Sequence, residues 1–277
     1  MSGRIIAAAL LIGLLFTGQA SAAIRTEEIL RLSQKAQPES HQFAQEQNAR
    51  FLPTRDGRSF VLWREPAGFN AAKDTVLVSL HGHGGWAARD FEVWYPHIKD
   101  RGYAFMAVQW WYGRSMEPIG YAKPRDIYAW ITEALESRGI PRGHVIFEGF
   151  SMGSANSFAV TYLDRLQPEP YFAVTISQSG ELESDFPPNR PFYEAGEKGR
   201  PFAGAHWILY CGERDTSRPN ICEHMEENKR TLESFGATVD KFIRDPDGEH
   251  GGFMKSSQCG PALDLADTIV ASGLSRK

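Results

Sequence analysis

Short apolar runs, separated by segments of helical periodicity, dominate the chain from residue 75 onward. A strand that is covered on both faces of a parallel sheet is a continuous apolar run, because neither face meets water. The pattern therefore predicts a mostly parallel central sheet, with strands over residues 75–80, 103–110, 144–150, 172–177, 206–210 and 238–243.

The segments between these runs have the spacing of helices. Residues 126–137 place Ile127, Trp130 and Ile131 on one helical face, and Gly139 follows as a stop signal. Parallel strands need a crossover connection, which helices in the other gaps can supply. We expect these helices over residues 91–99, 154–166, 222–234 and 262–271, which gives an alternating β-α-β order.

Different signals precede residue 75. A short helix is expected to begin at Thr26, because Glu27 and Glu28 place acidic side chains in its first turn. The dipeptide Asp-Gly at 56–57 supplies the positive φ of a hairpin turn, and strand-like residues flank it. We therefore predict an antiparallel pair over residues 50–53 and 59–63, ahead of the parallel strands.

Residues 180–204 interrupt the regular alternation. This segment contains four prolines, several charges and aromatic side chains such as Phe192, and it is too irregular for a helix. Long loops of this kind in compact domains are often functional. We expect a lid or substrate-binding loop here, with a plain surface insertion as the alternative.

The first 22 residues have the composition of a signal peptide. Arg4 precedes an apolar run over residues 5–16, and Ala-Ser-Ala at 20–22 fits the small-x-small cleavage pattern. The run is shorter than the ~20 residues that a membrane-spanning helix needs. We expect a single domain over 23–277 that is secreted or periplasmic and has no stable membrane anchor; an uncleaved anchor is the alternative.

Composition limits the partners. The chain has 277 residues, of which 42% are hydrophobic, enough for one sizeable core. The net charge of −4 and the pI near 6.1 leave no basic face for binding phosphates, so no nucleic-acid partner is expected. The charge favours a neutral or small substrate.

The strongest chemical motif is G-x-S-x-G over residues 149–153. It follows the predicted strand 144–150 and precedes a predicted helix, which is the context that this motif requires. At a sharp strand-to-helix turn, Gly149 and Gly153 leave room for the neighbouring backbone, and Ser151 is exposed near a helix N-terminus. Ser151 is therefore the candidate nucleophile.

A second motif, HGHGG over residues 81–85, ends the predicted strand 75–80. With both motifs, the chain resembles the α/β-hydrolase superfamily, especially its secreted serine esterases, which include feruloyl and acetyl esterases and polyhydroxybutyrate depolymerase-like proteins. The resemblance covers about 75–270. It implies that the backbone N–H groups of His83 and Met152 form the oxyanion hole, with Gly84 as the alternative to His83.

The two histidines of the second motif also allow another interpretation. Zinc hydrolases place H-x-H after a strand, but neither an acidic ligand nor a third histidine follows within this loop. We therefore expect neither a metal nor another cofactor, and we expect His81 to be a structural hydrogen-bonding residue.

The resemblance also implies the other two catalytic residues. His250, in the loop before the last helix, is the expected general base, while His206 and His224 fit structural or exposed positions better. Asp215 follows strand 206–210 and is the expected acid, with Glu213 as the neighbouring rival and Asp247 as a weaker one. The chain order Ser151, Asp215, His250 is that of this fold.

Three cysteines, Cys211, Cys222 and Cys259, allow at most one intramolecular disulfide. No C-x-x-C spacing occurs, so a zinc site through cysteine is not expected. We take a bridge between Cys222 and Cys259 as the hypothesis, since it would join the helix after Asp215 to the segment after His250.

These observations predict a secreted serine hydrolase that cleaves carboxylic esters, either small or linked to a polymer, through an acyl-enzyme intermediate. The acyl group is not determined, because fold and triad do not fix it. A serine peptidase of the same fold and a non-catalytic binding protein remain the alternatives.

Overall fold

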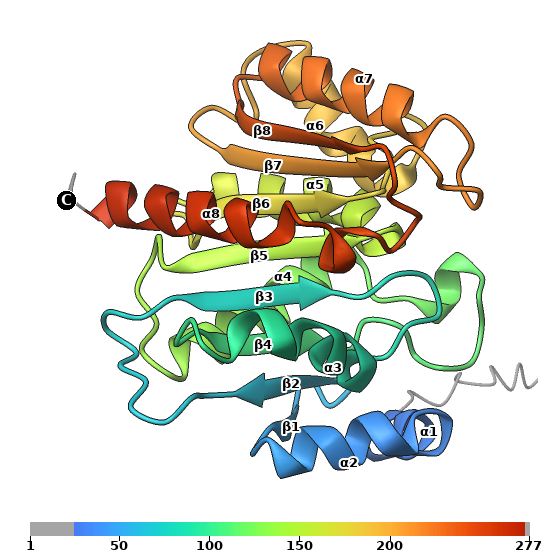
Figure 1. The fold of residues 1–277 in the computed structure, drawn as a ribbon, viewed down its shortest axis with the longest axis vertical. Helices are drawn as coiled ribbons and strands as arrows, with labels where there is room; N and C mark the ends of the chain where they lie inside the picture. Colours follow the sequence, from blue (N-terminus) through green and yellow to red (C-terminus); the bar gives the residue numbers. More distant parts are fainter. Residues whose placement is uncertain (1–24, 275–277) are drawn as a thin grey trace, which may run out of the picture.

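Eight strands form one sheet in the computed structural model, which describes residues 25–274 (Figure 1). They lie in the order β1-β2-β4-β3-β5-β6-β7-β8. The pairs β1–β2 and β2–β4 are antiparallel, and the others are parallel. The strand bounds are β1 Arg50–Pro53, β2 Phe60–Arg64, β3 Val76–Leu80, β4 Ala104–Val108, β5 Val145–Phe150, β6 Phe172–Gln178, β7 His206–Gly212 and β8 Thr238–Asp245.

This architecture confirms the predicted fold class. All six strands expected in the parallel part are present, as is the N-terminal hairpin, whose Gly57 has a φ of 67°. The apolar runs predicted these strands because both faces of the sheet are covered. Leu77 and Ile146 belong to the core on one face, whereas Val76 and Val78 belong to the core on the other.

Helices cover both faces of the sheet (Figure 1). Buried residues of α3 and α8 pack in the core that contains Leu77, and those of α4 and α5 pack with Val76; α7 packs on Trp207. The helix bounds are α1 Thr26–Ala36, α2 Pro38–Glu46, α3 Ala87–Ile98, α4 Pro124–Glu136, α5 Met152–Arg165, α6 Arg190–Gly196, α7 Ile221–Ser234 and α8 Cys259–Leu274.

Two helices near the site begin earlier than the sequence predicted. The helix expected from residue 91 begins at Ala87, whose N–H donates to the side-chain oxygen of Gln109 at 2.9 Å. The helix expected from residue 154 begins at Met152, directly after Ser151. In both cases, a tertiary contact or a strained residue outside the helix determines its first turn.

Residues 180–204 are more ordered than predicted, so the expectation of a wholly irregular segment was wrong. A 3₁₀ turn, η2 (Pro187–Asn189), leads into α6, and Phe192 and Phe202 are fully buried against Trp207 and Phe158. Burial of these rings explains why a proline-rich segment forms a helix. The segment contributes no lining residue to the cavity beside Ser151, so its role as a lid stays a prediction.

The predicted signal peptide, residues 1–22, lies outside the described residues. Within residues 25–274, no helix has the length and apolar composition needed to cross a membrane.

Candidate active site

Ser151 lies at the turn between β5 and α5. Its φ of 54° and ψ of −117° are rare for a residue with a side chain, and such strain persists only where the surroundings hold it. Its N–H donates to the carbonyl of Gln178, on the neighbouring strand β6, at 2.8 Å. Strand pairing therefore holds the hydroxyl at the carboxyl edge of the sheet.

The two glycines of the motif are required by close backbone contacts. A Cβ on Gly149 would lie 2.5 Å from the carbonyl oxygen of Gly153, and a Cβ on Gly153 would lie 2.2 Å from that of Leu80. Real Cβ atoms do not approach oxygen atoms so closely, so the turn accommodates only glycine at both positions.

We expect Gly153→Ala to destabilise the protein by at least about 1–3 kcal/mol, because the backbone of β3 must move to admit the methyl group. The reactivity of Ser151 should fall with it, since Gly153 lies two residues from Ser151. Gly260→Ala, in α8 where nothing lies within 4 Å of the added Cβ, is the matched control. Urea unfolding of both variants checks this, and an unchanged midpoint for Gly153→Ala would contradict it.

His250 lies between Ser151 and Asp215. Its Nε2 is 2.8 Å from Oγ of Ser151, and its Nδ1 is 2.5 Å from Oδ2 of Asp215. Oδ1 of Asp215 accepts the backbone N–H groups of Ser217 and Arg218 at 2.8 and 3.0 Å, and the side chain of Asp215 is fully buried. The three predicted residues therefore form a continuous hydrogen-bonded chain.

The rival acids are bound elsewhere. Glu213 accepts Nε of Arg244 at 2.7 Å, and Asp247 lies 2.5 Å from Nη2 of Arg214. Both carboxylates are exposed to solvent. Of the three candidate acids, Asp215 is the one that contacts His250.

The loops that carry Asp215 and His250 touch through glycines. A Cβ on Gly212 would lie 2.3 Å from the carbonyl oxygen of Gly248, and the N–H of Arg214 donates to that same oxygen at 2.9 Å. This close approach brings together an acid and a base that are 35 residues apart in the chain.

The disulfide differs from the hypothesis. Cys211 and Cys222 are bonded, with a Cα–Cα distance of 5.2 Å, and Cys259 is free and buried. The Cys222–Cys259 bridge was wrong because Cys259 begins α8, on the face of the sheet opposite to α7. The bridge that forms closes the loop that contains Asp215.

Replacement of Cys211 and Cys222 by alanine is expected to lower the free energy of unfolding by about 3 kcal/mol, because the crosslink restricts the unfolded chain. Chemical denaturation under oxidising conditions measures the loss. Peptide mass mapping should find Cys211 linked to Cys222 and Cys259 alkylated; a linked peptide that contains Cys259 would contradict the structure.

The candidate oxyanion hole involves the loop after β3 and the start of α5. Met152 is the first residue of α5, so its N–H has no acceptor within the helix. The N–H of Gly84 donates to the hydroxyl of Tyr121 at 3.1 Å, which favours His83 over Gly84 as the second donor. The side chains of the two remaining donors touch, with Nδ1 of His83 3.1 Å from Sδ of Met152.

A cavity of about 690 Å³ opens beside Ser151 and His250. Apolar parts of its wall come from Trp86, Phe150 and Met254. Trp110 does not line this cavity but packs in the core, where its indole N–H donates to the carbonyl oxygen of His81.

Sequence reasoning missed a buried polar network in this cavity. Asp90, in the first turn of α3, and Glu148, three residues before Ser151, both lie 2.5 Å from Oγ of Ser79. Burial raises the pKa of Asp90 to about 7, and burial followed by the charge of Asp90 raises the pKa of Glu148. A glutamate within the apolar strand 144–150 was the available signal.

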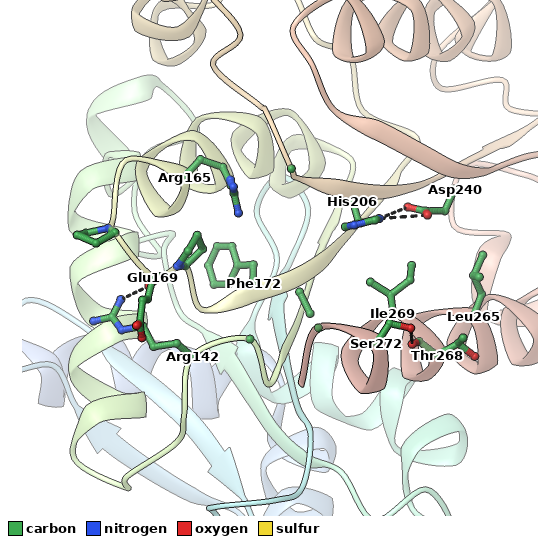
Figure 2. Close-up of a pocket in the computed structure, with 16 residues that line it drawn as sticks. Arg142, Arg165, Glu169, Phe172, His206, Asp240, Leu265, Thr268, Ile269 and Ser272 are labelled. Atoms are coloured by element: carbon green, nitrogen blue, oxygen red, sulfur yellow. Dashed lines mark hydrogen bonds and ion pairs between the residues drawn. The ribbon is translucent and has the colours of Figure 1, made fainter. Parts of the chain in front are cut away.

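A second cavity, of about 510 Å³, lies at the opposite edge of the sheet (Figure 2). There Nδ1 of His206 lies 3.0 Å from Oδ2 of Asp240, and Figure 2 shows the two side chains pointing toward one another. No serine, threonine or cysteine is bonded to this histidine in the described chain, so the pair lacks a nucleophile. His224 lies 3.1 Å from Glu181, likewise away from Ser151.

The described residues contain no group of three or more histidine, cysteine, aspartate or glutamate side chains with the geometry of a metal site. His81 uses its Nδ1 to donate to the carbonyl oxygen of Gly82 at 2.8 Å.

Known proteins match this chain through structure. No protein-family model and no curated protein sequence matches it. Esterase B from Lactobacillus rhamnosis has a TM-score of 0.60 at 14% identity, covering 89% of this chain and 96% of its own. The hyperthermophilic esterase from Pyrobaculum calidifontis has a TM-score of 0.56 at 14% identity, with coverages of 88% and 94%. Esterase LipW from Mycobacterium marinum has a TM-score of 0.58 at 14% identity, covering 90% of this chain and 90% of its own.

The chain therefore has the α/β-hydrolase fold, as the resemblance implied. Identities this low establish the fold alone. The chemistry must be argued from the residues around Ser151.

Proposed function

We propose that this protein is a serine hydrolase that cleaves carboxylic esters through an acyl-enzyme intermediate. The observation that supports it most strongly is the chain of hydrogen bonds from Ser151 through His250 to the buried Asp215, on a strained turn beside an open cavity. The structural neighbours named as esterases agree with this class of reaction.

In the first half of the reaction, Oγ of Ser151 attacks the ester carbonyl carbon while Nε2 of His250 takes the hydroxyl proton. The carbonyl oxygen becomes an oxyanion, which the N–H groups of His83 and Met152 would stabilise. The carbon–oxygen bond to the alcohol then breaks, and His250 returns its proton to the leaving alcohol oxygen.

In the second half, water attacks the acyl group on Ser151. His250 takes a proton from the water and then returns it to Oγ of Ser151 as the acid leaves. Asp215 holds Nδ1 of His250 as the donor throughout, and its charge stabilises the imidazolium. In each half of the reaction, His250 is therefore protonated once and then returns to its neutral form.

The test combines labelling with two parallel assays. A fluorophosphonate probe should label Ser151 of the wild-type protein, and aryl esters should be hydrolysed much faster than peptide amides. Cleavage of amides at an equal or faster rate would show that the protein is a peptidase rather than an esterase. The absence of both labelling and turnover would indicate a binding protein that has retained the fold.

We further propose that the protein acts outside the cytoplasm after cleavage following Ala22. The signal-peptide pattern and the buried Cys211–Cys222 bridge support this, because disulfides persist in oxidising compartments. Intact mass spectrometry of the exported protein should find a chain that begins at Ala23. A full-length chain retained in the cytoplasm would contradict the proposal.

A further inference from the structure

One wall of the cavity beside Ser151 is polar and has no part in the proposed acyl transfer. It is formed by His81, Asp90, Glu148 and Gln178. Buried polar groups reduce stability unless they have partners, so such a wall in a substrate cavity needs an explanation.

The two carboxyl groups of this wall share a proton. Oγ of Ser79 lies 2.5 Å from Oδ2 of Asp90 and 2.5 Å from Oε2 of Glu148, but its single hydrogen can satisfy one of them. The other short contact needs a proton on the carboxyl group, which then donates to Ser79. Burial, which raises the pKa of both acids, agrees with one shared proton.

Within this network, Glu148 is satisfied and Asp90 is not. Trp94 and Gln178 donate to the two oxygens of Glu148 at 3.2 and 2.7 Å, in addition to the contact with Ser79. Asp90 uses Oδ2 for Ser79, and its Oδ1 has no hydrogen-bond or ion-pair partner among residues 25–274. The proton lies on the oxygen of Asp90 or of Glu148 that contacts Ser79. In either case, Oδ1 of Asp90 remains an acceptor.

His81 also lines this cavity and provides a second, independent acceptor. The residue is only 3% exposed, and its Nδ1 donates to the carbonyl oxygen of Gly82. Burial lowers the pKa of His81 to about 4, so the ring is neutral and Nε2 carries a lone pair. Nε2 has no partner in the described part of the chain. Two acceptors without a protein partner are therefore able to accept hydrogen bonds from a ligand.

The position of the wall indicates which part of an ester reaches it. His250 must protonate the leaving alcohol oxygen, so the alcohol leaves on the side of His250. The cavity continues there along Gly251, Met254 and Lys255. Exposed Lys255 places a positive charge at the cavity, which disfavours a cationic alcohol, whereas Arg89, which also lines it, is paired with Glu92 at 2.7 Å.

We propose that this cavity binds the alcohol part of the substrate and that Asp90 and His81 accept hydrogen bonds from its hydroxyl groups. The substrate class is then an ester of a neutral polyhydroxylated alcohol. This inference rests on the proposed ester hydrolysis.

The test compares two butanoate esters on the wild-type protein. One is 2,3-dihydroxypropyl butanoate, and the other is 2-methylbutyl butanoate, in which a methyl group replaces each hydroxyl. An acceptor that bound substrate shields from water and leaves unpaired lowers kcat/KM, so the dihydroxypropyl ester should be preferred by about 10-fold to 100-fold. Equal rates, or a preference for the hydrocarbon ester, would overturn the subsite.

A variant assigns the preference to Asp90. In Asp90→Ala, the ratio of kcat/KM between the two esters should fall at least about fivefold, because the acceptor is lost. Asp100→Asn removes an exposed carboxylate just beyond α3 and should leave the ratio unchanged. A ratio that Asp90→Ala leaves intact in folded protein would overturn the role of Asp90. The wild-type comparison remains decisive where the variant does not fold.

Two further substrates separate the causes of failure. Faster hydrolysis of 2-(dimethylamino)ethyl butanoate than of the dihydroxypropyl ester would mean that the cavity prefers an ammonium group to hydroxyl groups. This result would overturn the proposal. Hydrolysis of 4-nitrophenyl acetate without a hydroxyl preference would reject the subsite alone. No hydrolysis of any ester would reject the proposed function, and the subsite with it.

Discussion

Ser151→Ala is expected to reduce ester turnover by about 10⁶-fold, the scale of loss when a serine hydrolase lacks its nucleophile. Without Oγ, no covalent bond to the acyl group can form, and His250 has no hydroxyl proton to accept. The fold should persist, because the removed oxygen is bonded to His250 at the edge of a cavity rather than packed in the core. Turnover of an activated ester and circular dichroism measure both expectations.

Ser179 offers a matched control for this variant. It also has a positive φ, of 51°, and its buried hydroxyl has no hydrogen-bond partner among the described residues. Ser179→Ala should therefore keep turnover within a few-fold of wild type. Retained activity in Ser151→Ala, or an equal loss in both variants, would disprove the assignment of the nucleophile.

Asp215→Asn is expected to reduce turnover by about 10⁴-fold, as the corresponding change does in serine proteases. The amide oxygen can still accept the N–H groups of Ser217 and Arg218, which directs the amide NH₂ toward Nδ1 of His250. Nδ1 must then accept, so the proton moves to Nε2. A protonated Nε2 cannot take the proton of Ser151.

Glu213→Gln and Asp247→Asn are the controls for the acid. Both carboxylates are exposed and bind arginines on the surface, so their amide variants should lose little turnover. Circular dichroism on all three variants separates lost chemistry from lost folding. If Asp247→Asn falls by orders of magnitude while Asp215→Asn stays near wild type, the acid belongs to the histidine loop.

The sequence was sufficient wherever the physical cause is local. A strand covered on both faces is largely apolar throughout, so the parallel strands were predicted from the apolar runs along the chain. The cause of the turn at Ser151 is also local. The glycines two residues before and after Ser151 lie within one short segment, so the turn was predicted from that segment. Its flanking strand and helix confirmed that context.

Proximity between distant segments was decided by the tertiary structure. Glu213, Asp215 and Asp247 were all plausible acids in the sequence, and the contact between Gly212 and Gly248 selects Asp215. The disulfide depended on which face of the sheet each helix covers. Cys222 packs in the core on the same face of the sheet as Cys211, whereas Cys259 packs in the core on the other face.

The polar wall of the cavity also required the structure. Asp90 and Glu148 are 58 residues apart by their numbering, and nothing local to either predicts that Ser79 bridges them. The sequence alone determined the strands, the strained turn and the chain order of the candidate residues, since these depend on neighbouring residues. The acid, the disulfide and the cavity beside Ser151 depend on how β3, β5 and β7 lie in one sheet, and only the folded sheet brings their loops together.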